Sequence, residues 1–341
     1  MNKKVVSFGE IMLRLSPPNY QRIIQTDSFD ATYGGGEANV SISLANFGLD
    51  SYYVTKLPRN ALGDAALNHL RRFGVKVDYI IRGGDRLGIY FLEIGAAQRP
   101  SKVIYDRAHS AIADAKVGEF DWNEIFKDAH WFHFTGITPA LSDSAGKLTL
   151  EALKNAKQKN LKISCDLNYR GKLWSTEKAN KVMTSLMNYV DIVLGNEEDA
   201  EKIFNIKASE SDISTGKLDK EGYRNVAKEL IERFNLELVA ITLRESYSAS
   251  DNVWSAIIYD GKNFYSSNKY KIHIVDRVGG GDAFAGGLIY SLINNKKLSE
   301  SLEFAVAASC LKHTIPGDFN MMSIEEVKSL QKGNISGRVQ R

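Results

Sequence analysis

Apolar residues along the chain alternate between two spacings, one typical of strands and the other of helices. Val, Phe, Ile and Leu fall at strand spacing over residues 4–15, and a loop with two prolines follows. A run of three glycines at 34–36 then leads into apolar residues at helical spacing, which end before Gly48. We expect a strand, a helix at 37–46, a strand at 52–56, a helix at 61–73 and a strand at 77–81.

The same alternation resumes at residue 131 and continues to the end of the chain. We predict strands at 131–135, 162–167, 191–194 and 238–243, extended runs near 253–259 and 264–275, and helices at 142–159, 176–189, 197–204, 220–234, 281–293, 299–312 and 323–331. Residues 205–218 are polar and rich in Ser, as is typical of a surface connection. Repeated βα units predict a mostly parallel sheet covered by helices on both faces, with ligands bound at the carboxyl ends of its strands.

One region interrupts the alternation. Residues 88–93 and 102–106 form two short extended runs, and a segment with glycine and proline at 95–100 separates them. This pattern predicts a β-hairpin inserted into the βα series.

Composition and charge exclude several classes of protein. The chain has 341 residues, 43% of them hydrophobic and 25% charged, which describes one large or two moderate globular domains rather than a disordered or fibrous chain. The 44 basic and 41 acidic residues give a formal charge of +3 with no block of like charge, so we expect no nucleic-acid or membrane partner. No run approaches the ~18 apolar residues of a membrane helix.

Cysteine and histidine usage favours neither disulfides nor a metal site. Cys165 and Cys310 lie far apart, neither has a His at metal-ligand spacing, and we interpret both as core thiols. His130 and His133 would point to opposite faces of one strand, which prevents them from binding a metal together. The N-terminus does not have the pattern of a signal peptide, so a reducing cytoplasm is the expected location.

The segment 276–287 carries the most chemical information. It reads Asp-Arg-Val-Gly-Gly-Gly-Asp-Ala-Phe-Ala-Gly-Gly, and it follows an extended run and opens an apolar helix. Gly279, Gly280 and Gly281 let the backbone approach a ligand and leave unpaired amides at a helix N-terminus, which forms an anion site.

Asp282 at that helix start has two interpretations. It is either an ordinary capping carboxylate or the base that takes a proton from a hydroxyl attacking a phosphate held by the amides. Other phosphate motifs are absent, because the chain contains neither Gly-x-x-x-x-Gly-Lys-Ser/Thr nor Gly-x-Gly-x-x-Gly. P-loop enzymes and ordinary dinucleotide-binding dehydrogenases are therefore disfavoured.

Together with two further motifs, this segment resembles the ribokinase-like (pfkB) carbohydrate kinases. The others are Gly-Gly-Glu-Ala-Asn at 35–39 and Asn-Glu-Glu-Asp at 196–199, and the resemblance covers nearly the whole chain. It implies one three-layer αβα domain over 1–341, with a mostly parallel central sheet and a small β-sheet lid formed by about 12–33 and 87–108. It also implies ATP and Mg²⁺, with a monovalent cation such as K⁺ as a further candidate.

Departures from the family pattern narrow the resemblance to one group of kinases within the family. Arg277 stands where the family often has Thr, Asp199 ends the Asn-x-x-Glu motif, and 245–250 lacks the usual glycines of the nucleotide loop. Arg277 and Val278 resemble the variant in kinases that act on 2-keto-3-deoxygluconate. The similarity extends to Gly-Ile-Tyr-Phe at 88–91, Tyr-Asp-Arg at 105–107, and the segments 166–170, 172–174 and 316–318.

This resemblance implies a role for each matching residue. Asp282 would be the base, and the amides of Gly279, Gly280 and Gly281 would stabilise the transferring phosphoryl group. The expected sugar-acid ligands are Gly35, Asn39, Tyr90, Tyr105, Arg107, Arg170, Asp282 and Asp318. The expected nucleotide ligands are Asn168, Arg170, Asn196, Thr242, Arg244, Gly279 and Gly281, with Asp199 acting indirectly on magnesium. On composition alone, the tyrosines would be packing residues and the arginines would be in surface ion pairs.

Three other functions compete with a kinase for 2-keto-3-deoxygluconate. A kinase for a neutral sugar, such as a fructokinase or ribokinase, would need no paired arginines. A non-catalytic sugar sensor would usually lack Asp282, and a nicotinamide oxidoreductase would have the missing dinucleotide motif. The sequence does not decide whether the substrate is the gluconate or the galactonate epimer. Edge strands of the lid predict a homo-oligomer, a dimer or higher.

Overall fold

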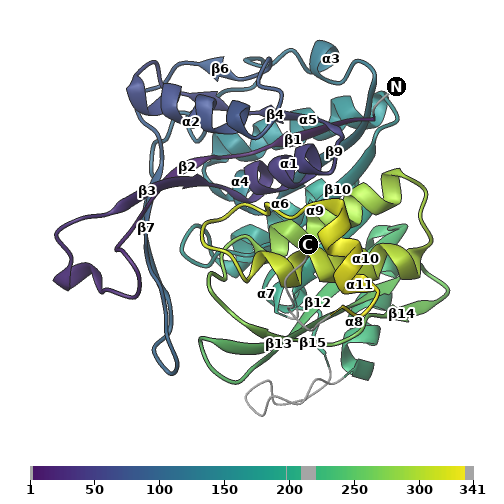
Figure 1. The fold of residues 1–341 in the computed structure, drawn as a ribbon. Coiled ribbons are helices and arrows are strands. Elements are labelled where there is room, and N and C mark those ends of the chain that lie inside the picture. Colours follow the sequence, from purple (N-terminus) through teal and green to yellow (C-terminus); the bar gives the residue numbers. More distant parts are fainter. Residues whose placement is uncertain (1–2, 197, 209–219, 335–341) are drawn as a thin grey trace.

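A computed structural model of the protein describes residues 3–196, 198–208 and 220–334 (Figure 1). A large sheet with helices on both faces forms its body, and a small sheet projects from one side (Figure 1). Within the described ranges, every helix is too short or too polar to cross a membrane.

The large sheet has nine strands. They are β1 (Lys4–Phe8), β4 (Asp50–Val54), β9 (Ala129–Thr135), β10 (Lys162–Asp166), β11 (Ile192–Asn196), β12 (Leu238–Ser246), β13 (Asp251–Tyr259), β14 (Phe264–Ser266) and β15 (Tyr270–His273). Their order is β14-β13-β12-β11-β10-β9-β1-β4, and β15 also pairs with β13. All pairs from β4 to β12 are parallel, whereas β13 and its neighbours pair antiparallel at the edge. This confirms the predicted mostly parallel sheet.

Successive strand residues point to opposite faces of the sheet. Both faces therefore carry apolar side chains, and helices cover both. The helices are α1 (Gly36–Asn46), α2 (Ala61–Arg72), α3 (Trp122–Ile125), α4 (Ile137–Ala140), α5 (Asp143–Gln158), α6 (Thr176–Met187), α7 (Asp199–Phe204), α8 (Lys220–Phe234), α9 (Gly280–Ile293), α10 (Leu298–Lys312) and α11 (Ile324–Gln331), with a short 3₁₀ turn η1 (Ile23–Gln25). Val6 of β1 packs in a core with α5, α6, α7 and α8. Val5 packs in a second core with α1, α9 and α10. These two cores confirm the three-layer αβα arrangement.

The small sheet contains the predicted hairpin and two strands from near the N-terminus. Its order is β3 (Asp30–Gly34), β2 (Met12–Ser16), β7 (Ile89–Glu93) and β8 (Lys102–Asp106), with β2 and β7 parallel. A further two-stranded sheet joins β5 (Lys56–Leu57) and β6 (Ile81–Arg82). The small sheet comes from the two segments predicted to form a lid, and its role as a lid remains a prediction.

The structure corrects three details of the pattern-based prediction. The run 4–15 is not one strand, because it breaks after Phe8 and its second half enters the small sheet as β2. The strand expected at 77–81 is reduced to the two residues of β6, and the short helices α3 and α4 were not anticipated. Most of the predicted polar connection at 205–218 lies outside the described residues.

Candidate active site

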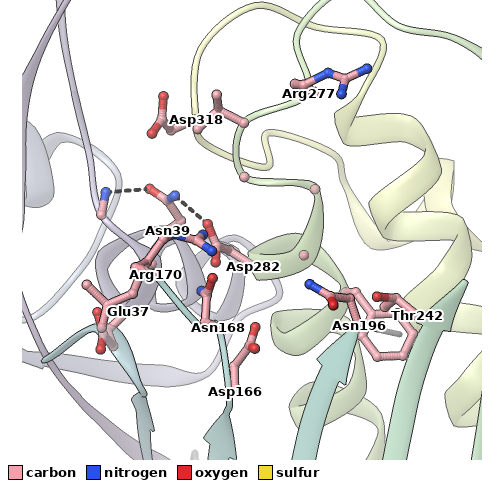
Figure 2. A pocket seen from close by; sticks show the side chains of 18 of the residues that line it. Glu37, Asn39, Asp166, Asn168, Arg170, Asn196, Thr242, Arg277, Asp282 and Asp318 are labelled. Carbon is pink, nitrogen blue, oxygen red and sulfur yellow. Dashed lines mark hydrogen bonds between the residues drawn. The ribbon is translucent and has the colours of Figure 1, made fainter. Parts of the chain in front are cut away.

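A cavity of about 410 Å³ opens at the carboxyl ends of the parallel strands, beneath the small sheet (Figure 2). Every residue that the sequence proposed for the site lies on its wall: Gly35, Asn39, Tyr90, Tyr105, Arg107, Asn168, Arg170, Asn196, Asp199, Thr242, Arg244, Gly279, Gly280, Gly281, Asp282 and Asp318. The parallel sheet therefore brings segments from the whole chain to one place, as expected for this class of fold.

Asp282 lies in the first turn of α9, where it is half-buried on the cavity wall. Asn39 of α1 donates a hydrogen bond from Nδ2 to Asp282 Oδ2 at 2.6 Å, and its Oδ1 accepts one from the Gly35 amide at 3.2 Å (Figure 2). Burial raises the pKa of Asp282 to about 6, although the bond from Asn39 opposes the shift. The N-cap of α9 is Gly279 and not Asp282. The capping interpretation is therefore wrong, and the carboxylate is oriented by another helix.

The glycine loop before Asp282 has a shape that side chains would prevent. Gly279 has φ 82°, and a Cβ there would lie 1.9 Å from the Asp318 carbonyl oxygen. A Cβ on Gly281 would meet no described atom within 4 Å, so this position faces open space. The first amides of an α-helix have no partner within the helix. The loop therefore presents free N–H groups and a helix N-terminus to the cavity, where an anion is stabilised.

Asp276 accepts hydrogen bonds from the backbone of this loop and of a second loop. Its Oδ1 accepts a hydrogen bond from the Val278 amide at 3.1 Å, and its Oδ2 accepts one from the Gly317 amide at 3.0 Å. Arg14 of β2 also donates to Asp276 Oδ2 at 2.5 Å. The first acid of the signature is therefore a structural residue that joins two loops and the small sheet.

Arg14, which belongs to none of the sequence motifs, also binds Asp318. Its Nη1 donates to Asp318 Oδ1 at 2.6 Å, and the Tyr90 hydroxyl donates to Asp318 Oδ2 at 2.5 Å. All three side chains are buried. Asp318 and Tyr90, both proposed as sugar ligands, thus engage each other on the cavity wall.

Arg107 has a partner that the sequence did not predict. Its Nε donates to Glu10 Oε2 at 2.8 Å, and its Nη2 binds the same oxygen. The other oxygen of Glu10 is buried without a hydrogen-bond partner, and Glu10 also lines the cavity. A charged residue inside the apolar run 4–15 was the signal that sequence reasoning passed over.

Three carboxylates gather around Arg170. Asp166 ends β10, Asp199 begins α7, and Arg170 opposes the rise in pKa of both and of Asp282. Burial raises the pKa of Asp166 well above its usual value, and Asp199 and Asp282 add to this effect. Both oxygens of Asp199 accept backbone amides, from Tyr169 and from Asn196, each at 2.9 Å.

Glu37 is a second buried acid that the sequence assigned no role. Its Oε1 accepts bonds from the Thr135 amide at 2.9 Å, the Thr135 hydroxyl at 2.8 Å and the Thr138 hydroxyl at 2.7 Å. Burial raises the pKa of Glu37 to about 7 despite these bonds. Its place at the start of α1, next to the paired glycines, fixes α1 against the end of β9.

The described residues include no group of three or more His, Cys, Asp or Glu arranged to hold a metal ion. Mg²⁺ often keeps several waters and binds through one or two carboxylates plus substrate phosphates. Asp166 and Asp199 on the cavity wall fit that mode of binding.

A carboxylate beside a glycine loop and a helix N-terminus, at the strand ends of a three-layer αβα fold, is the arrangement that phosphoryl transfer requires. The chain matches the pfkB family of carbohydrate kinases over residues 2–324, and it belongs to this family. This confirms the resemblance found in the sequence.

Individual relatives are similar along their whole length. A 2-dehydro-3-deoxygluconokinase structure from Thermotoga maritima shares 57% identity and a TM-score of 0.94, covering 97% of this chain and 100% of that one. A 2-dehydro-3-deoxygalactonokinase from Haloferax volcanii is 33% identical over 99% of each chain. A ribokinase-like structure from Escherichia coli in complex with ATP and Mg²⁺ has 18% identity and a TM-score of 0.81, covering 97% of this chain and 99% of that one. The last likeness shows the fold alone.

Proposed function

We propose that the protein transfers the terminal phosphoryl group of ATP to the terminal hydroxyl of 2-keto-3-deoxygluconate, which is also called 2-dehydro-3-deoxygluconate. The observation that carries this proposal is the half-buried Asp282 carboxylate next to the amides of Gly279–Gly281, in one cavity with Arg107 and Arg170. The 57% identical relative has the same named activity.

Each group has a role in the reaction. The ionised Asp282 carboxylate accepts the proton of the attacking hydroxyl, and Asn39 holds that carboxylate in place. The amides of the glycine loop face the charge that develops on the transferring phosphoryl group. Mg²⁺, bound with the nucleotide phosphates, would neutralise their charge, and Asp166 and Asp199 would hold it through water.

Guanidinium groups suit the carboxylate of a sugar acid. Arg107 Nη1 has no hydrogen-bond partner among the described residues, while its Nε and Nη2 are fixed by Glu10. Planar guanidinium groups recognise carboxylates with good geometry. Arg107, Arg170, Tyr90, Tyr105, Gly35, Asn39 and Asp318 are the proposed sugar-acid ligands. Asn168, Arg170, Asn196, Thr242 and Arg244 are the proposed nucleotide ligands, and Thr242 lies opposite Asn196 in the register of β11 and β12.

The relatives name two epimers, gluconate and galactonate, and the similarity is greater to a gluconate enzyme. A kinase for a neutral sugar is the competing function, and the arginines on the cavity wall argue against it. A non-catalytic sensor would have no need of a base oriented as Asp282 is.

We further propose a homo-oligomer that forms through the small sheet. Exposed apolar side chains gather there and on the segment that links β2 to β3: Tyr20, Ile24, Phe29 and Ile104. A reducing cytoplasm suits the two free, buried cysteines. We also propose that a monovalent cation such as K⁺ activates the enzyme. Replacing K⁺ with tetramethylammonium in the assay tests this.

The position of phosphorylation tests the proposed reaction. Incubation of 2-keto-3-deoxygluconate with MgATP should yield a phosphate monoester on the terminal CH₂, which gives a ³¹P signal split by two protons. A product that carries phosphate on a ring or chain CH carbon would contradict the proposed placement of the terminal hydroxyl at Asp282.

A further inference from the structure

Two arginines on the nucleotide side of the cavity lack an acidic partner. Arg107 is paired with Glu10, and Arg170 lies among three carboxylates. Arg244, near the end of β12, and Arg277, before the glycine loop, also line the cavity. Within the part of the chain that the structure describes, neither has a carboxylate oxygen within ion-pair distance. Asp276, the acid next to Arg277, is instead bound by Arg14.

The two guanidinium groups lie close enough to affect each other. The pKa of Arg277 is lowered by burial and then by Arg244. The pKa of His313 falls to about 4, mainly through burial, and both arginines contribute to this shift. His313 is therefore neutral near pH 7 and does not add to the charge. Asp276 partly opposes the lowering of the Arg277 pKa, but its carboxylate is ion-paired with Arg14. Two like charges held together without an ion-paired acid of their own favour a multivalent anion between them.

Arg244 has hydrogen-bonding capacity to spare. Its Nε is buried and has no hydrogen-bond partner among the described residues, and its guanidinium group lies 5.5 Å from the centre of the Trp254 ring. A buried donor without a partner costs free energy, and a bound anion would remove that cost. Stacking on Trp254 holds the guanidinium plane in one orientation.

Arg277 is fixed by the loop that departs from the family pattern. Its Nη2 donates to the Ala249 carbonyl oxygen at 3.0 Å, in the glycine-free hairpin between β12 and β13. Ala249 in turn donates from its amide to the Ala97 carbonyl oxygen at 2.7 Å, in the loop between β7 and β8. Figure 2 shows the Arg277 side chain extending away from Asp318. The two unusual features of the sequence, Arg277 and the missing glycines, therefore contact each other.

We propose that Arg277 and Arg244 together bind the terminal phosphates of the nucleotide, and that Arg277 is a phosphate-binding residue of this kinase. The pair neutralises charge on the polyphosphate, and the glycine loop binds the phosphoryl group that is transferred. This inference rests on ATP as the phosphoryl donor of the proposed function and not on the identity of the sugar acid.

Nucleotide binding in the absence of any sugar tests the pair. The affinities of the Mg²⁺ complexes of a non-hydrolysable ATP analogue and of ADP, and of AMP, are measured by calorimetry at two salt concentrations. The variants are Arg277→Gln, Arg244→Gln and, as a control, Arg71→Gln on α2, whose side chain is exposed and outside the cavity. Glutamine removes the charge and keeps amide donors on a shorter side chain.

We expect each cavity variant to bind the ATP analogue about 10- to 100-fold more weakly, the usual value of one charge-assisted hydrogen bond. The affinity for ADP should fall less, and the affinity for AMP should not change. The affinity that remains should depend less on salt concentration. The control should match the wild type. Equal losses for all three nucleotides would point to a disturbed hairpin and overturn the proposal, as would unchanged affinities. Because no sugar is present, failure of the sugar-acid assignment would leave these results unaffected.

Discussion

The proposed reaction depends most on the carboxylate of Asp282. Its bond from Asn39 and the N-cap at Gly279 exclude the capping role, and the proposed function makes it the base. We expect Asp282→Asn to lower kcat by about 10²- to 10⁴-fold, the usual contribution of a general base. Calorimetry should show sugar-acid binding close to that of the wild type. Asp143→Asn, an exposed acid at the start of α5, is the matched control and should retain full turnover.

The pH dependence of the reaction follows from the same group. A base works only when ionised, and the pKa of Asp282 is raised to about 6, so kcat/KM should fall as the pH drops through about 6. Asn39→Ala removes a bond that favours the ionised form, so this limb should move to higher pH by about one unit. A pH profile of both proteins measures the shift. If the acidic limb lay at the same pH in both proteins, Asn39 would have no effect on the pKa of the base.

Residue identities were predictable where they belong to motifs and not where they depend on tertiary contacts. The glycines, Asp282 and Asn39 occur at fixed spacings that physical reasoning and resemblance can interpret. Arg14 lies in the strand β2 and Glu10 in the link before it, and their partners are 262 and 97 residues away. No local pattern encodes pairs at such separations.

At the scale of elements, Arg14 ties the small sheet to the body. It belongs to β2, whereas Asp276 and Asp318 belong to the loops around the start of α9 and the end of α10. We expect Arg14→Met to lower the free energy of unfolding by about 3–5 kcal/mol, because it leaves two buried carboxylates without their partner. Urea denaturation measures the loss.

An exposed ion pair on the same side of the molecule provides the comparison. Arg86 pairs with Asp106, and the two side chains are 35% and 55% exposed. Arg86→Met should therefore change stability by less than about 1 kcal/mol. If Arg14→Met proved as mild as this control, the small sheet would not be joined to the glycine loop through Arg14.

The periodicity of apolar residues predicted most helices and strands. It did not predict where one strand ends or which sheet the next strand joins. The run 4–15 has one apolar pattern, yet β1 and β2 belong to different sheets. The chain breaks at Gly9, where a Cβ would lie 2.1 Å from Glu37 Oε2. This break depends on packing against a distant helix, so strand spacing alone does not reveal it.

At the scale of the whole molecule, the exposed apolar side chains of the small sheet predict self-association. Ile104 on the edge strand β8 is 54% exposed, and Ile24 is 83% exposed. We expect sedimentation to show a dimer or larger assembly, and Ile104→Lys to shift it toward monomer by placing a charge in the interface. Leu62→Lys, at an exposed apolar residue of α2, should have no such effect. A wild-type monomer at micromolar concentration would refute this assembly.

The global charge of +3 says little about the function, because the charges that matter are local. Within the cavity, three acids lie near Arg170, whereas Arg244 and Arg277 have no acid at ion-pair distance among the described residues. Such a division is created by folding, since these residues come from many segments of the chain. Composition gave no reason to expect a nucleic-acid partner, and it did not predict which charged residues lie together in the cavity.

The central claim is phosphorylation of a sugar acid, and a substrate panel tests it most directly. ADP release is measured with 2-keto-3-deoxygluconate, its galactonate epimer, fructose and ribose at equal concentrations with MgATP. We predict the highest kcat/KM for 2-keto-3-deoxygluconate and low values for both neutral sugars, because only the acids use the arginines of the cavity. A kcat/KM for fructose or ribose equal to or above that for the two acids would contradict the account.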